Sequence, residues 1–180
     1  HLSWALNSYT ILFASLSIPL GRLAELYGRT KIYLIGLGLF LLGSLSSGIA
    51  GSVSGLIIGR SIQSVGAAIV FPASMTIGIQ AVSLEHRTGA IAILGVTQGL
   101  AAALGPTIGG VVTQLFGWRG IFLLNVPLVI VALIGCWLLL DRQPVKRQTV
   151  KLDFLGSGLS MLTLASLTLV LVKGSDWGWT

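Results

Sequence analysis

One charged residue lies inside a long apolar stretch of the chain. Arg60 belongs to the run Gly59-Arg60-Ser61-Ile62-Gln63-Ser64. A charge within a membrane span is costly unless it faces water or a partner, so Arg60 is a candidate for ion coupling. At about 100° per residue, one helix face collects a small, polar stripe that we expect to line a cavity: Arg60, Gln63, Ser64, Ala67, Phe71 and Ser74. Alternatively, Arg60 extends its side chain to the nearby membrane surface.

A second group consists of glycines and one proline. Within an arc of about 140° on a helix lie Gly95, Gly99, Gly105, Pro106, Gly109 and Gly110. Such a face is a flat groove against which another helix backbone can pack. Pro106 removes one internal hydrogen bond and allows bending at that point. The alternative is static tight packing.

A third group surrounds an acidic residue among basic ones. The segment Gly21–Lys31 contains Glu25 together with Arg22, Arg29 and Lys31. We expect a loop in which Gly21 and Gly28 allow a tight reversal and Glu25 forms ion pairs that hold neighbouring helix ends. The alternative is an ordinary basic loop.

Small polar residues also follow one face of the first apolar stretch, namely Ser3, Asn7, Thr10 and Ser17. Because they fall on an arc of about 80°, they predict either a substrate cavity, with Asn7 in its wall, or a helix contact.

The elements that must position these residues are membrane-spanning helices. Hydrophobic residues make up 54% of the 180 residues and charged residues only 9%, against about 25% charged in soluble domains. A span needs about 20 mostly apolar residues. Six stretches qualify: Leu2–Leu20, Ile32–Ala50, Ser54–Val82, Gly89–Val112, Gly120–Leu140 and Phe154–Val172. We therefore expect an all-α polytopic membrane protein in which residues 1–180 form one partial domain.

The basic residues orient these spans. Alternate loops hold eight of them: Arg22, Arg29, Lys31, Arg87, Arg142, Lys146, Arg147 and Lys151. The opposite side holds Arg119 and Lys173, with Trp118, Trp177 and Trp179 at interfacial depth. The excess of Lys and Arg places the first set in the cytoplasm.

Other classes of function fit poorly. The basic clusters form no face for nucleic acid. Cys136 is the single cysteine, and the two histidines, His1 and His86, are far apart in sequence, so neither a disulfide framework nor a metal site is predicted. No cofactor is expected, and the spans lack an acid or histidine for a membrane-embedded enzyme. Because the chain opens with His1, we expect an internal piece of a longer protein.

Three motifs resemble those of the major facilitator superfamily. Gly21–Lys31 resembles G-x-L-a-D-r-x-G-r-k, with Glu25 at the aspartate position and Leu26 and Thr30 replacing two bases. The run from Gly59 resembles R-x-x-Q-G-x-G-a-a, with Ser64 replacing a glycine. Gly99–Gly110 matches the antiporter motif G-x-x-x-x-x-G-P-x-x-G-G at every fixed position. In that family the first motif serves conformational change, and the arginine of the second serves proton coupling.

Flanking segments resemble the drug:proton antiporters of this superfamily. Trp4 and Tyr9 match an aromatic pair of their second helix, and Trp118-Arg119, Phe122, Asn125 and Pro127 match the entry to their sixth. Asp153-Phe154-Leu155-Gly156 resembles the start of the extra seventh helix in the fourteen-span branch.

The resemblance implies helices two to seven of a proton-coupled exporter of drugs or other small amphiphilic or cationic compounds, multi-pass in the cell membrane. Its partners would be the small-molecule substrate, protons, the lipid bilayer and the remainder of its own chain. Alternatives are a metabolite or anion carrier of the same superfamily, or a non-transporting membrane receptor on the same fold. Because all five acids fall in loops or at span ends, we expect the proton-carrying acid outside this chain.

Overall fold

The structure, a computed structural model, describes residues 2–139 and 154–174. Within these ranges the chain forms six α-helices: α1 (Leu2–Tyr27), α2 (Arg29–Gly48), α3 (Val53–Gln80), α4 (Arg87–Phe116), α5 (Trp118–Leu139) and α6 (Phe154–Lys173). A short 3-10 turn, η1 (Leu84–His86), precedes α4. The prediction of an all-helical bundle is confirmed. The basic loop 141–153 and Trp177 and Trp179 lie outside the described residues.

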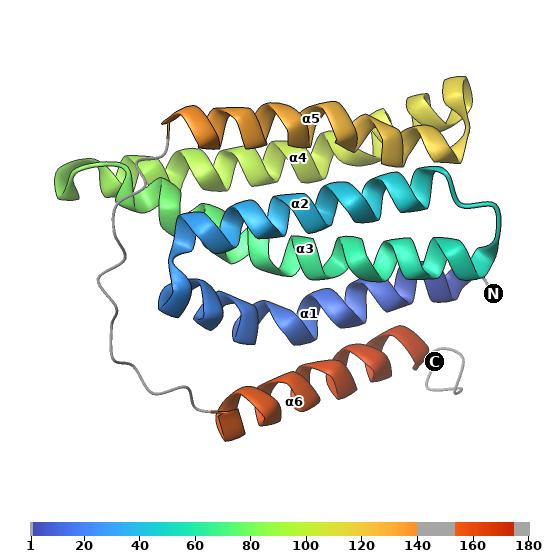
Figure 1. The fold of residues 1–180 in the computed structure, drawn as a ribbon, viewed down its shortest axis with the longest axis horizontal. Helices are drawn as coiled ribbons and strands as arrows, with labels where there is room; N and C mark the ends of the chain where they lie inside the picture. The colour runs from blue at the N-terminus through green and yellow to red at the C-terminus, as the bar shows by residue number, and fades with distance from the viewer. Residues whose placement is uncertain (1, 140–153, 175–180) are drawn as a thin grey trace.

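Five of these helices, α2 to α6, are long and apolar enough to cross a membrane. Within the described residues α1 does not join them, since serine, threonine and asparagine interrupt its apolar run. The span Leu2–Leu20 therefore stays a prediction. The helices lie roughly along one direction, and the connections from α1 through α5 alternate between the two ends of the bundle (Figure 1).

The predicted loop over Gly21–Lys31 is mostly wrong. α1 continues through Tyr27 and α2 begins at Arg29, so Gly28 is the one residue between them. Gly28 has a φ of 101°, a conformation that side-chain-bearing residues rarely adopt. Gly21 lies inside α1. Helix satisfies the backbone hydrogen bonds of this segment internally, and the reversal needs only one glycine.

The core lies where α3 packs against α2 and α1. Small residues face each other across the α2–α3 interface, so the two backbones come close. A Cβ atom at Gly36 would fall 2.6 Å from a methyl carbon of Ile69, and one at Gly59 would fall 2.6 Å from Oγ of Ser47. This interface holds the polar residues of the site in fixed positions.

The remaining helices surround this core. α5 packs against α2, and α6 packs against α1. The start of α5 is fastened to the end of α2, because Nη2 of Arg119 donates a hydrogen bond of 2.8 Å to the carbonyl of Ala50. α4 contacts α5 and α3 but has no buried residue in the part of the chain that the structure describes.

Candidate functional site

An aromatic ring from α1 covers the half-buried arginine of α3. Cζ of Arg60 lies 3.9 Å from the centre of the Tyr9 ring and 5.7 Å from that of Phe122 on α5. A guanidinium ion over an aromatic face gains about 0.5–2 kcal/mol, and the gain grows as water is excluded. Arg60 is half-buried, so these rings replace part of its lost hydration.

A chain of hydrogen bonds leads from Arg60 into the α2–α3 interface. Nη1 of Arg60 donates to Oε1 of Gln63 at 2.6 Å, and Nε2 of Gln63 donates to Oγ of Ser44 at 2.8 Å. Gln63 is 1% exposed and Ser44 is fully buried. A buried amide without hydrogen-bond partners is costly. By accepting from Gln63, Ser44 therefore helps to fix the side chain that accepts the hydrogen bond of Arg60.

The backbone of α1 is tied to the same group. Oγ of the buried Ser64 donates a 2.8 Å hydrogen bond to the carbonyl oxygen of Tyr9. The structure thus brings together three of the predicted residues, Arg60, Gln63 and Ser64. Asn7, two residues before Tyr9, is partly buried and takes no part in these bonds.

A cavity of about 350 Å³ lies beside this group. Its walls come from α1, α2, α3 and α5, and four of its lining side chains are aromatic: Tyr9, Phe13, Phe40 and Phe71. Three residues of the predicted stripe line the cavity, namely Ala67, Phe71 and Ser74. The other residues of the stripe, Arg60, Gln63 and Ser64, make the hydrogen bonds described above. One part of the stripe therefore surrounds the charge, and the other part lines the cavity.

Arg60 has no ion pair within the described ranges 2–139 and 154–174. The acids in these ranges, Glu25 and Glu85, lie at the connections α1–α2 and α3–α4. A guanidinium stays charged throughout the physiological pH range. Arg60 is therefore a fixed positive charge held by π and amide groups, and it can attract an acid that comes near.

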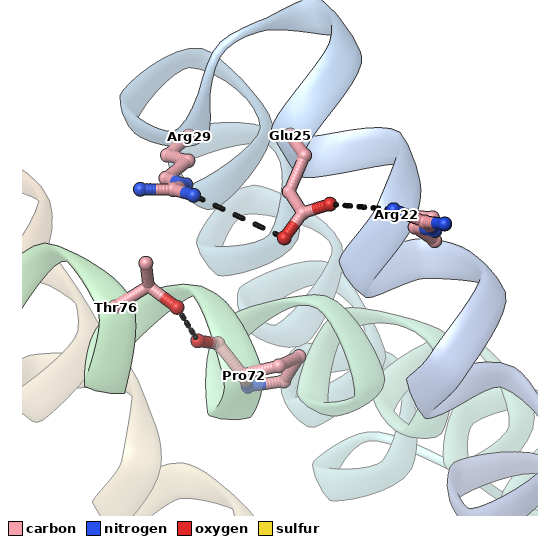
Figure 2. Close-up of polar contacts among 5 residues, drawn as sticks. All are labelled: Arg22, Glu25, Arg29, Pro72 and Thr76. Carbon is pink, nitrogen blue, oxygen red and sulfur yellow. Dashed lines mark hydrogen bonds and ion pairs between the residues drawn. The ribbon is translucent and has the colours of Figure 1, made fainter. Parts of the chain in front are cut away.

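The acidic residue of the first motif forms the expected pairs. Glu25 binds Arg22 at 3.3 Å and Arg29 at 3.9 Å, so the carboxylate bridges the end of α1 and the start of α2 (Figure 2). All three side chains are between 30% and 57% exposed, so the pairs contribute little to stability, about 0–1 kcal/mol each. Lys31 is exposed and has no ion pair among the described residues.

The same end of α1 packs against a proline of α3. A Cβ atom at Gly21 would meet the Pro72 ring at 3.7 Å, an ordinary contact. One helical turn further along α3, Oγ1 of Thr76 donates a 2.9 Å hydrogen bond to the carbonyl of Pro72 (Figure 2). Gly21 and Pro72 thus bring this end of α1 against α3.

The antiporter motif lies on an uncovered helix. Gly99, Gly105, Gly109 and Gly110 lie on α4 with Pro106, and a Cβ at any of these glycines would meet no described atom within 4 Å. The groove predicted from their spacing has no occupant in the described part of the chain. Its role as a packing or bending surface stays a prediction.

Two features of the site escaped sequence reasoning. Ser44 gave no usable signal, because Ser46 and Ser47 lie beside it in the same apolar stretch. The close α2–α3 approach was recoverable in part. Gly36 and Gly43 are seven residues apart, as are Gly59 and Gly66, and a spacing of seven keeps residues on one helix face.

This arrangement is a bundle of apolar helices with a half-buried arginine that has no ion pair in the described part of the chain and lies beside an apolar cavity, which is the construction of a membrane transporter. The family model of the Major Facilitator Superfamily matches residues 1–179. The chain belongs to this superfamily, a family of transporters rather than enzymes.

Similar proteins have names that refer to drugs. The chain is 39% identical to the methylenomycin A resistance protein of Bacillus subtilis (strain 168), over 98% of this chain and 38% of that protein. It is 36% identical to the cephamycin export protein CmcT of Amycolatopsis lactamdurans, over 99% and 37%. It is 31% identical to the multidrug resistance protein Stp of Mycobacterium tuberculosis (strain CDC 1551 / Oshkosh), over 99% and 33%. The chain thus spans less than two fifths of these relatives.

Proposed function

We propose that this chain is part of a proton-coupled antiporter that exports small drug-like molecules across the cell membrane. The observation that carries the proposal is Arg60, a charge that has no ion pair among the described residues and that lies next to an aromatic cavity. The names of the relatives, which refer to drug resistance and export, support the substrate class. The complete antiporter motif on α4 supports export rather than uptake.

The proton itself must be carried by another group. Arg60 does not titrate, and a buried carboxylate is the usual carrier because burial raises its pKa toward neutrality. In our proposal this acid comes from a part of the longer protein that lies outside this chain. When the acid is deprotonated it binds Arg60, and when it is protonated it leaves, so the proton state is converted into a helix movement.

The test is a gradient-driven efflux assay on the complete protein in everted vesicles. Vesicles acidified inside are given a fluorescent cation such as ethidium, and cation uptake and internal pH are followed together. The proposal expects cation uptake that dissipates the pH gradient and stops when a protonophore is added. Two outcomes would contradict the proposal: cation uptake that continues unchanged without a pH gradient, and failure to take up any of several cations. Either outcome would favour a metabolite or anion carrier of the same superfamily, or a non-transporting receptor.

A further inference from the structure

Tyr9 is the residue at which the charged group and the cavity meet. One face of its ring lies against the guanidinium of Arg60, with 3.9 Å from Cζ to the ring centre. The same ring is part of the cavity wall. Among the lining residues, all of which the structure describes, Tyr9 is the one whose ring also contacts Arg60.

The Tyr9 ring also starts a row of aromatic contacts along the cavity. It is stacked parallel to Phe13, with ring centres 6.2 Å apart and an interplanar angle of 1°. Phe13 in turn meets Phe71 of α3 edge to face, at 5.9 Å and 75°. A flat molecule that enters this cavity must pack against these rings, since they form most of the large side chains of its wall.

The backbone of Tyr9 is held by a bond that does not involve its ring. Ser64 on α3 fixes the Tyr9 carbonyl by a 2.8 Å hydrogen bond. Side-chain rotation about χ1 and χ2 moves the ring without breaking that bond. The ring can therefore leave Arg60 without separation of α1 from α3.

We propose that Tyr9 is a positioning residue that links occupancy of the aromatic cavity to the exposure of Arg60. In the observed position the ring lies over the guanidinium, where it keeps the charge from an acidic partner. A flat apolar or aromatic molecule that packs on the ring draws it away and uncovers the charge. This inference rests on the proposed function, and it adds the element that makes proton movement depend on the transported molecule.

The test compares Tyr9→Leu with Tyr9→Phe in the complete protein, reconstituted in proteoliposomes with a pH gradient. Proton flux is measured with and without ethidium, and ethidium flux is measured in parallel. Tyr9→Phe retains the ring and should retain the requirement for ethidium. In Tyr9→Leu, proton flux without ethidium should rise by about tenfold, the factor equivalent to losing one partly desolvated cation–π contact.

Two further variants control for the loss of an aromatic side chain elsewhere in the protein and for misfolding. Phe116→Leu removes an aromatic ring that is 74% exposed at the end of α4, outside the cavity and the three motifs, and its fluxes should match those of the unaltered protein. If Tyr9→Leu does not fold, Tyr9→Met serves instead, because methionine fills irregular space without a ring. Size-exclusion profiles establish that each compared variant is folded.

The outcomes separate the two proposals. Coupled flux in the unaltered protein together with unchanged coupling in the ring-less variant would overturn the role of Tyr9 alone. Equal leaks from Tyr9→Phe and Tyr9→Leu would also overturn it, because the hydroxyl rather than the ring would then be the active feature. An unaltered protein that moves ethidium without protons, or not at all, would remove the proposed function and this inference with it.

Discussion

Gly43 of α2 lies directly against Gln63 of α3, because a Cβ atom at residue 43 would fall 2.5 Å from Cα of Gln63. The obstacle is backbone, which cannot move aside as a flexible side chain can. We expect Gly43→Ala to separate the two helices and to cost about 1–3 kcal/mol of folding free energy, as overpacking generally does.

Thermal unfolding of the complete protein in detergent, followed by size-exclusion chromatography, measures this effect. Gly38→Ala is the matched control, since a Cβ at Gly38 on the same helix meets nothing within 4 Å. Equal melting temperatures for the two variants would contradict the close approach.

Two fully buried serines of α2 should respond in opposite ways. Oγ of Ser44 accepts from Gln63, whereas Oγ of Ser47 has no hydrogen-bond partner among the described residues. Ser44→Ala should destabilise the protein by about 1–3 kcal/mol, because it leaves a buried amide unsatisfied. Ser47→Ala should be neutral or slightly stabilising, since it removes an unpaired buried hydroxyl. A larger loss of melting temperature for Ser47→Ala would show that the polar chain is assigned wrongly.

Arg60 should be required for coupling more than for folding. Arg60→Ala removes the charge, and we expect gradient-driven efflux to stop while membrane levels stay near normal. Arg60→Lys keeps a charge but loses the planar fork of donors. The loss of one charge-assisted hydrogen bond corresponds to about a tenfold or greater drop in rate. Efflux of ethidium from cells, normalised to the amount of protein in the membrane, measures both variants. Parental rates in Arg60→Ala would exclude the coupling role.

Leucine at Gly105 and at Gly36 should separate function from folding. Gly36 faces Ile69 closely, whereas Gly105 faces no described atom within 4 Å. Gly36→Leu should therefore reduce the folded yield several-fold. Gly105→Leu should leave insertion and yield unchanged and yet abolish efflux or cause a proton leak, because it fills the groove that we expect other helices of the longer protein to approach. Normal, tightly coupled efflux in Gly105→Leu would leave the antiporter motif without a role here.

The orientation of the bundle is testable by labelling of single cysteines in a Cys136→Ser background. Cysteines at Gly51 and Thr113 should react with an impermeant maleimide from outside intact cells. Cysteines at Thr30 and Thr88 should react only after the membrane is opened. These positions lie at opposite ends of the helices, and the excess of Lys and Arg decides which end is cytoplasmic. Reversal of the two sets would overturn the predicted topology.

Much of the fold was predictable because apolar run length is a direct physical signal. The helices α2 to α6 lie within a few residues of the predicted stretches, since spans must satisfy their backbone hydrogen bonds internally. The loop Gly21–Lys31 was mispredicted because its two glycines and its charges suggested a reversal, whereas Gly21 lies inside α1 and only Gly28 makes the turn. Arg60 was identified from the cost of placing a charge inside a span, and Gln63 from its position on the same helix face.

The partners of Arg60 were harder to predict. That Tyr9 would meet Arg60 depends on the rotation of α1 about its own axis, which the sequence of α1 does not determine. Ser44 reaches Gln63 because the neighbouring Gly43 lets α2 approach α3. The role of Ser44 therefore depends on how the two helices pack. Such contacts depend on how two helices pack together, and the residue pattern within one helix does not predict them.

The unequal burial of the helices has a consequence for how the protein is made. α1, α2 and α3 follow one another in the chain and already contain most of the buried residues, so their core can close as soon as α3 has left the ribosome and entered the bilayer. α4 arrives next with all of its glycines uncovered, and lipid must cover them until later segments arrive. We expect newly made protein halted at that stage to be the form that membrane proteases recognise and degrade.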